Sequence, residues 1–223
     1  MKSRTRSAPR SHDETRRQLL EASGEVFAET GFRDATVREI CRRAGANVAA
    51  VNYHFGDKET LYVEVLRYAH GKALEKYPPS MGLPENAPPE KRLHAFIHSL
   101  LLRIFDKGPY SWHGKLMSRE MIEPTGALDS LVEERIRPMS AQLWKIVSEI
   151  MDLPLNDQRV WQCGFSVVSQ CVFFHHCRPV VTRLFPKQLP QDAASIKQLA
   201  EHITTFSLAA MKSIRPGSKR KGL

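Results

Sequence analysis

Residues 36 to 58 read TVREICRRAGANVAAVNYHFGDK, and this stretch predicts two short helices joined by a tight turn. Thr36 and Glu39 have the spacing of a capping box, in which each side chain accepts a hydrogen bond from the other residue's backbone amide. Apolar residues then recur at helical spacing as far as Gly45, which can adopt the left-handed conformation that ends a helix. Asn47 can cap the second helix. Two short helices joined by a glycine-containing turn are typical of a helix-turn-helix.

The second of these helices is expected to bury Val48, Val51 and Phe55 and to turn a small, hydrogen-bonding side outward. This outward side contains no Asp, Glu or long aliphatic residue. A DNA major groove admits such a helix, because its polar and small groups can contact base edges and thymine methyls. The alternative is an ordinary surface helix, since short motif matches include false positives. The predicted DNA contacts are Asn47, Ala49, Ala50, Asn52 and Tyr53 in the groove, and Thr36, His54 and Lys58 at phosphates.

At these residues the chain resembles the TetR family of bacterial transcriptional regulators, and the run from Asn47 to Gly56 is most similar to its CecR-type subgroup. The matching segments are FAETGF at 27–32, TVREI at 36–40, AG at 44–45, YHF at 53–55 and KE at 58–59. The resemblance covers residues 13 to 75 and continues more loosely into the C-terminal part. It implies an all-α homodimer whose N-terminal helices bind operator DNA and whose C-terminal helices dimerise and hold a ligand.

The periodicity of the remaining sequence predicts helices throughout, about nine in total. We expect a disordered basic arm over residues 1–11, a three-helix DNA-binding domain over 12–57, a helical ligand-binding and dimerisation domain over 58–214, and a basic tail over 215–223. The arm is either a solvated tail or a segment that follows the DNA backbone or minor groove. A long helix starting at Lys58 belongs to both domains, and Pro138 should kink or split a helix over 128–151.

Composition and charge favour a globular protein and weaken a purely electrostatic argument for DNA binding. The net charge is +9, yet Lys and Arg residues in the two terminal segments account for nearly all of it. The prediction of DNA binding therefore depends on the recognition helix. The four cysteines lack CxxC spacing, and the sequence shows neither a signal peptide nor an apolar stretch long enough to span a bilayer. We therefore expect a cytoplasmic location and no membrane partner.

Two C-terminal helical segments carry more apolar surface than one chain can cover. Residues 160–177 are apolar on nearly every side, and residues 192–214 have two apolar stripes. The simplest way to bury both is against their copies across a two-fold axis, in a four-helix interface. The predicted interface residues are Val167, Cys171, Phe174, Ile196, Leu199, Ile203, Phe206 and Ala210.

A ligand cavity is expected where the middle helices converge. Aromatic residues and methionines at helical spacing indicate either an ordinary core or an apolar cavity with a few polar groups such as His113, Gln170 or His175. An apolar or aromatic small molecule fits this composition better than a sugar phosphate. The predicted lining residues are Phe96, Leu100, Trp112, His113, Met117, Met121, Trp144, Phe165, Gln170 and Phe173.

The sequence contains no P-loop, GxGxxG, HExxH or GxSxG motif, so we expect no enzymatic activity and no cofactor. Cys171 and His175 share a helix face, but a zinc site needs more ligands than this cluster offers, and we predict no metal. The expected function is a ligand-responsive repressor that binds a palindromic operator as a homodimer and is released by a small-molecule effector. The alternatives are a non-specific DNA-binding or protein-interaction module, and a helical protein that only binds a small molecule or acts on it.

Overall fold

The computed structural model describes residues 11–187 and 189–215, and within them the chain is helical, as predicted. The predicted arm and tail lie outside the described residues except for Ser11 and Arg215. No helix in the described part combines the length and hydropathy that crossing a bilayer requires. In chain order the helices are α1 (His12–Asp34), α2 (Val37–Ala44), α3 (Val48–Phe55), α4 (Lys58–Lys76), α5 (Pro89–Ile104), α6 (Trp112–Ile122), α7 (Ala127–Leu131), the π-helical η1 (Val132–Ile136), α8 (Arg137–Met151), α9 (Gln158–His176), α10 (Arg178–Leu184) and α11 (Ala193–Ile214).

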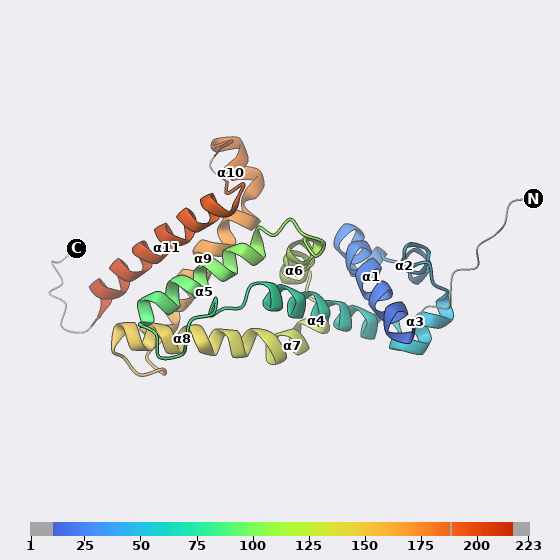
Figure 1. Cartoon of the computed structure of the whole chain (residues 1–223), viewed down its shortest axis with the longest axis horizontal. Helices are drawn as coiled ribbons and strands as arrows, with labels where there is room; N and C mark the ends of the chain where they lie inside the picture. The colour runs from blue at the N-terminus through green and yellow to red at the C-terminus, as the bar shows by residue number, and fades with distance from the viewer. Residues whose placement is uncertain (1–10, 188, 216–223) are drawn as a thin grey trace, which may run out of the picture.

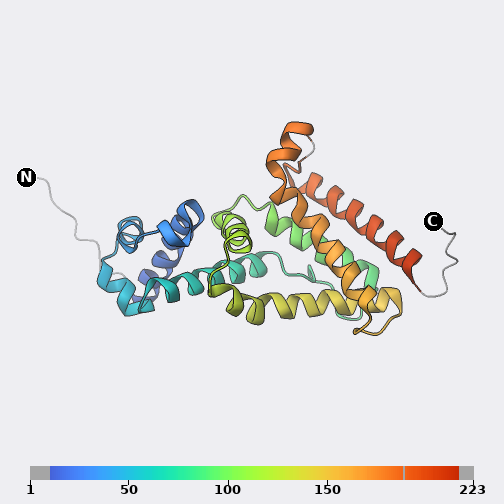
Figure 2. The same cartoon turned by 180° about the vertical axis from the view of Figure 1, so that it is seen from behind.

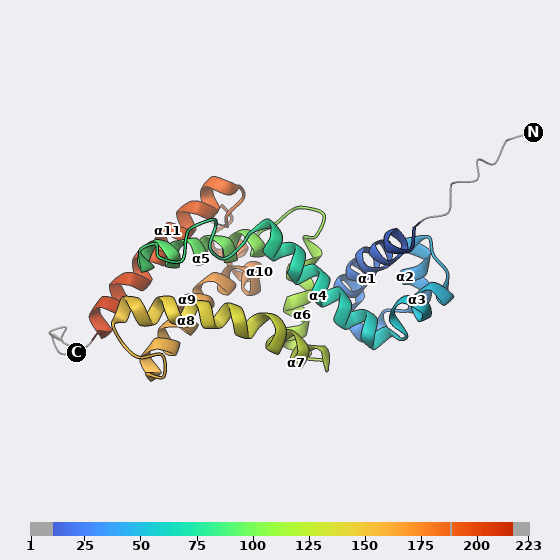
Figure 3. The same cartoon turned by 60° about the horizontal axis from the view of Figure 1, so that its bottom comes forward.

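The helices form two groups at opposite ends of an elongated molecule (Figure 1). Helices α1, α2 and α3 make a small unit at one end, and α5, α8, α9 and α11 pack together at the other. Helix α4 runs from the first group to the second, as the view from behind also shows (Figure 2). Helix α6 lies beside α4, between the two groups (Figure 3). Helices α4 and α6 are therefore the elements that connect the two ends.

The helix-turn-helix forms at the predicted residues. The Thr36 hydroxyl accepts a hydrogen bond from the Glu39 amide at 3.2 Å, which caps α2. The second hydrogen bond of the predicted capping box, from the Thr36 amide to the Glu39 side chain, is wrong. The Glu39 carboxylate accepts instead from the guanidinium groups of Arg42 and Arg43. A charge-assisted pair with an arginine competes successfully with a bond to one backbone amide.

The turn between α2 and α3 depends on one glycine. Gly45 has φ 59° and ψ 37°, the left-handed conformation that side chains disfavour. Its amide donates to the carbonyl of Arg42, and the next amide, that of Ala46, donates to the carbonyl of Cys41. This pair of bonds closes the end of α2 as a Schellman motif. The Asn47 side chain then caps α3 by accepting from the Ala50 amide at 2.9 Å.

The region predicted as one kinked helix over 128–151 consists of α7, η1 and α8. Pro138 is the second residue of α8, and the π-helical segment immediately precedes it. A proline ring lacks an N–H and clashes with the carbonyl four residues earlier in a regular α-helix. The wider π-helical turn accommodates this ring, so the predicted break is confirmed and takes the form of a π-helical insertion.

The structure has eleven α-helices among the described residues, where the sequence predicts about nine. The split at Pro138 accounts for one of the additional helices, and α10 is the other. A proline near Arg178 suggests the end of a helix, yet Pro179 lies in the first turn of α10. A proline is tolerated there, because the amides of the first turn have no partner inside the helix.

Two hydrophobic cores hold the two groups of helices, and α6 contributes to the core of the N-terminal group. Trp112 and Leu116 of α6 pack into that core, as do residues of α4. The predicted domain boundary between residues 57 and 58 therefore cuts through a continuous core, and it stays a prediction. Buried members of the first core include Leu20, Phe27, Ile40, Val51, Phe55 and Leu61; those of the second include Leu93, Phe96, Val147, Val167 and Ile203.

Candidate DNA-binding surface and ligand cavity

The outer side of α3 is a surface of small and hydrogen-bonding groups. Asn47, Ala49 and Asn52 are exposed, and 75% of Tyr53 is accessible to solvent. The Asn47 side-chain oxygen is used to cap α3, so the amide nitrogen is the part of this side chain that can donate to DNA. The arrangement matches what a major groove accepts, since it offers donors, acceptors and little bulk.

Two residues of α3 face differently from the prediction. Val48, expected to be buried, is 44% exposed. It is the first residue of the helix and lies about 60° round the axis from Val51, away from the line along which α3 packs. Ala50, expected on the outer side, is half-buried against the first core. Val48 therefore joins the outer surface, where its methyl groups are available to thymine methyls.

The residues predicted to meet phosphates differ in how accessible they are. Thr36 is exposed, and because its oxygen accepts from a backbone amide, its hydroxyl proton can be donated to a phosphate. His54 is half-buried between the rings of His12, at 4.4 Å between centroids, and Tyr53, at 5.2 Å. Burial, followed by the nearby His12 and Arg16, lowers the pKa of His54. His54 is therefore a neutral donor or acceptor at pH 7.

Lys58 makes contacts within the chain, and its predicted phosphate contact stays a prediction. Its ammonium donates to the backbone carbonyls of Arg33, at 3.2 Å, and Ala35, at 3.0 Å. It also lies 4.7 Å from the centroid of the Phe32 ring. The positive charge is attracted to these two carbonyl oxygens at the α1–α2 connection. Lys58 therefore links that connection to the start of α4 by hydrogen bonds. A phosphate could engage only its remaining proton.

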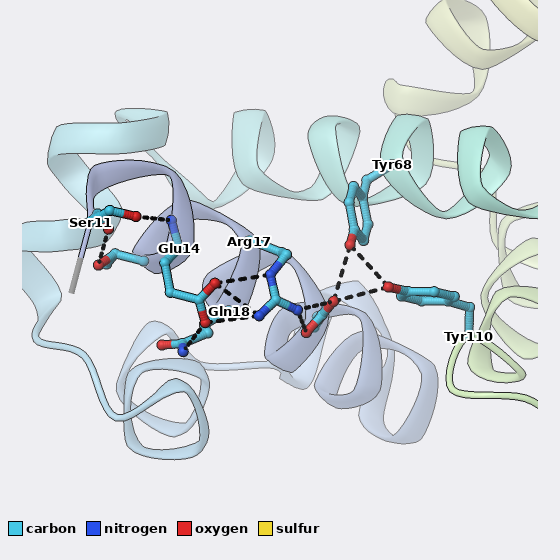
Figure 4. A network of polar contacts seen from close by, with 8 residues as sticks. Ser11, Glu14, Arg17, Gln18, Tyr68 and Tyr110 are labelled. Carbon is cyan, nitrogen blue, oxygen red and sulfur yellow. Dashed lines mark hydrogen bonds and ion pairs between the residues drawn. The ribbon is translucent and has the colours of Figure 1, made fainter. Parts of the chain in front are cut away.

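A polar network attaches helix α1 to the rest of the molecule (Figure 4). The Glu21 carboxylate of α1 accepts from the hydroxyls of Tyr68 in α4 and Tyr110 before α6, each at 3.1 Å. The same carboxylate pairs with Arg17, which also pairs with Glu14. One side chain of α1 is thus bound to two elements of the C-terminal part.

Helix α6 makes the second attachment. Arg119 donates to the backbone carbonyls of Ala28, at 3.1 Å, and Glu29, at 2.8 Å, near the end of α1. The fully buried Glu120 accepts from the Tyr62 hydroxyl of α4 at 2.7 Å. Burial, followed by this carboxylate, raises the pKa of Tyr62, so the hydroxyl remains a donor. One side of α6 therefore holds both α1 and α4.

The close contact between α1 and α6 at Gly24 yields a testable prediction. A Cβ atom at Gly24 would lie 2.3 Å from Cη2 of the buried Trp112 ring. We expect Gly24→Ala to lower the free energy of unfolding by ~1–3 kcal/mol, because the large ring cannot move aside. Urea denaturation measures this loss. The control is Gly71→Ala in α4, where a Cβ meets nothing within 4 Å.

The double variant Gly24→Ala/Trp112→Phe should recover part of the lost stability, because the smaller ring leaves room for the methyl group. A loss in Gly71→Ala as large as that in Gly24→Ala would contradict the clash as its cause.

A cavity of about 280 Å³ opens on the other side of α6. Four of the predicted lining residues line it: Leu100, His113, Met117 and Met121. His175, expected as one of the polar groups of the cavity, also lines it. Helices α4, α5, α8 and α9 and the π-helical η1 supply the rest of the wall. The remaining lining residues are His70, Arg103, Ile104, Gly114, Ser118, Ile136, Met139, Val168, Val172 and His176.

Six predicted lining residues lie elsewhere. Phe96 is in the second core, and Trp112 packs against α1. Trp144 packs edge-on against Phe165, which is 55% exposed and lies three residues before the cavity-lining Val168, about 60° round the axis of α9 from it. Phe173 is 49% exposed. Gln170 donates to the Ser207 hydroxyl of α11, because it faces that helix.

The cavity contains three buried polar side chains, of which sequence reasoning predicted only His113. Their exposed fractions are 3% for His70, 5% for Arg103 and 8% for His113. Burial lowers the pKa of His70 to about 4, that of His113 to about 3 and that of Arg103 to about 10. At pH 7 the imidazoles are neutral and the guanidinium is charged. The available signal for Arg103 was a cation within the apolar stripe of α5.

No three His, Cys, Asp or Glu residues are placed to hold a metal ion in the part of the chain that the structure describes. Cys171 is fully buried in the second core, and His175 borders the cavity.

The buried imidazoles make stability depend on pH. Below the ~6.5 of an unfolded imidazole, the unfolded chain binds protons that His70 and His113 do not bind in the fold. The free energy of unfolding therefore decreases as pH falls. We expect a loss of about 2 kcal/mol for each imidazole at pH 5 and no change between pH 7.5 and 8. Urea denaturation across this range measures it, and an equal loss in His70→Leu/His113→Leu would contradict the assignment.

The predicted dimer interface is partly wrong. Val167, Cys171, Ile196 and Ile203 are buried in the chain's own second core, since they face the neighbouring helices α5 and α8. Leu199, Phe174 and Ala210 are half-buried, and Phe206 is 60% exposed. The large apolar residues that stay exposed on the adjacent helices α9 and α11 are Trp161, Phe165, Phe173 and Phe206, which we call the α9/α11 face.

Two family models match the chain. Residues 19–65 match the bacterial regulatory proteins of the tetR family, and residues 89–211 match the C-terminal domain of the HTH-type transcriptional dual regulator CecR. The chain is 30% identical to CecR of Shigella flexneri over 171 residues, which cover 73% of this chain and 76% of that one. It is 24% identical to the repressor NicS of Pseudomonas putida, covering 91% and 93%.

Solved structures support the same fold. A transcriptional regulator from Pseudomonas aeruginosa PAO1 superposes with a TM-score of 0.67 at 18% identity, covering 92% of this chain and 96% of that one. One from Rhodococcus sp. Rha1 superposes with a TM-score of 0.63 at 19% identity, covering 87% and 96%.

Proposed function

Because the chain belongs to the TetR family of DNA-binding transcriptional regulators, with a CecR-type C-terminal domain, we propose that it binds a palindromic operator as a homodimer. We further propose that a small molecule in the cavity beside α6 releases the operator, so that the protein represses transcription until this effector is present. The family is not enzymatic. We also propose a cytoplasmic location, because a regulator must reach its operator DNA.

The exposed side of α3 carries this proposal. Asn47, Ala49, Asn52 and Tyr53 project from a short helix that α1 and α2 hold from behind. Asn52 can pair with adenine through two hydrogen bonds, and Val48 and Ala49 can contact thymine methyls. Thr36, at the N-terminus of α2, is placed to hold a phosphate against that helix end.

A dimer through the α9/α11 face would supply the second recognition helix. Four large aromatic side chains of these two helices stay exposed in the single chain, and a second copy would cover them. An isologous contact covers the same patch on both chains. Dimeric helix-turn-helix proteins place their recognition helices about 34 Å apart, one turn of DNA, and this spacing gives the operator its two-fold symmetry.

The coupling between cavity and DNA follows from the two sides of α6. His113, Met117 and Met121 face the cavity, whereas Trp112, Arg119 and Glu120 hold α1 and α4. A molecule that moves α6 must move these attachments. Helix α4, expected from sequence to belong to both domains, also contributes His70 to the cavity, so α6 and α4 act together. The effector shifts operator affinity only by its preference for one state, commonly ~1–3 kcal/mol.

The test is selection of operator DNA from a random pool, followed by footprinting and salt-titrated binding. We expect a two-fold symmetric sequence, protection of two adjacent major grooves, and affinity for this sequence ~10³-fold or more above that for scrambled DNA. A footprint without symmetry, or equal affinity for scrambled DNA, would favour the non-specific binding module.

A further inference from the structure

The cavity beside α6 holds a buried positive charge that the fold does not compensate. Arg103 is 5% exposed, and its charge persists at pH 7. Its Nε donates to the Ser99 carbonyl at a long 3.4 Å, its Nη1 contacts the Met139 sulfur at 3.3 Å, and its Nη2 has no partner among the described residues. Asp and Glu are absent from the cavity lining. A buried cation without a counter-ion is costly, which points to a ligand that supplies one.

Neighbouring imidazoles add donors directed at the same space. The rings of His70 and His113 lie 5.6 Å apart between centroids. Both nitrogens of His70 and Nε2 of His113 are buried without a partner among the described residues. A neutral imidazole offers one N–H donor, and a carboxylate accepts at two oxygens. The guanidinium and the two rings thus form a set of unsatisfied donors with one net charge.

The rest of the cavity wall favours a ligand whose uncharged part is small and apolar. Leu100, Ile104, Met117, Val168 and Val172 are apolar, and the volume of about 280 Å³ is at the small end of ligand cavities. A doubly charged phosphate would exceed the charge of Arg103, the one Lys or Arg side chain among the described residues of the lining, and would leave the apolar wall unused.

We propose that the effector is a small organic monoanion, a carboxylic acid with an apolar body, whose carboxylate pairs with Arg103 and accepts from His70 and His113. This inference rests on the proposed function for the regulatory role of the cavity. The binding of the acid itself is independent of DNA and can be measured without it.

Thermal denaturation of the full chain with phenylacetate and octanoate tests the proposal, with phenylacetamide and octanamide as matched neutral probes. We expect each acid to raise the Tm with increasing concentration and each amide to leave it unchanged. Arg103→Met should weaken acid binding at least tenfold and raise the Tm of the unliganded chain, because an apolar side chain replaces an unpaired charge. A purely structural Arg103 would lower that Tm instead.

Equal shifts by acids and amides, no shift by either acid, or an unchanged acid response in Arg103→Met would overturn the proposal. If Arg103→Met does not fold, the Arg103→Lys variant provides the test. Because it keeps the positive charge, each acid must still raise its Tm more than the matching amide does. Operator binding is measured in a separate experiment. Specific operator binding without a response to the acids would contradict only this inference. Acid binding that leaves operator affinity unchanged would contradict only the proposed release mechanism.

Discussion

Ala49→Glu is expected to abolish specific operator binding. Ala49 is exposed on the outer side of α3, between Asn47 and Asn52, so a carboxylate there would enter the major groove between two phosphate backbones. Losing one base contact commonly costs ~1–3 kcal/mol. A two-fold symmetric dimer carries the change twice, which gives ~2–6 kcal/mol, or ~30-fold to ~10⁴-fold in affinity. Titration of the selected operator in wild type and variant measures the ratio.

The control is Ala141→Glu, which makes the same change on an exposed position of α8 in the C-terminal part. It alters the net charge equally, so any general electrostatic effect on DNA affinity appears in both variants. The Tm of both chains should match wild type. If the two variants lose operator affinity equally, α3 is not the reading helix.

The helix-turn-helix could be predicted from sequence because its determinants are local. The Thr36 and Asn47 caps and the Gly45 turn each act within a few residues, and the structure has all three. What the sequence did not reveal here are the partners that compete for two side chains. Glu39 has two arginines within reach, and Lys58 has two carbonyls from the α1–α2 connection, neither of which the helical pattern reveals.

The cavity was predicted less well, because it depends on which sides of six helical elements converge. Periodicity identifies an apolar stripe but does not distinguish core from cavity wall, so Phe96 and Met117 look alike in sequence. The sequence of α9 likewise does not reveal which of its apolar residues the chain itself covers. Val167 faces the chain's own core, whereas Phe165 is exposed. The arginine in the apolar stripe of α5 was the signal that could have located the polar end of the cavity.

Phe206→Glu is expected to separate the proposed dimer and, with it, to weaken operator binding. Phe206 is 60% exposed, and its ring centroid lies 6.5 Å from that of His202 in the same helix. The substitution should therefore leave the folded monomer intact. Burying a Phe side chain is worth ~1.5–3 kcal/mol, and a two-fold interface contains it twice, which predicts dimerisation ~10²-fold to ~10⁴-fold weaker.

Sedimentation over a range of protein concentrations measures the dimerisation constant, and operator titration at the same concentrations measures its consequence. Ile122→Glu is the control, because Ile122 is 73% exposed but lies at the end of α6, outside the α9/α11 face. We expect this control to sediment as wild type does. A monomer holds one half-site only, so the Phe206 variant should lose the steep, two-site protection of the operator while keeping the Tm of its folded chain. A dimer that persists in Phe206→Glu would place the interface on another surface and remove the α9/α11 face from the account of operator symmetry.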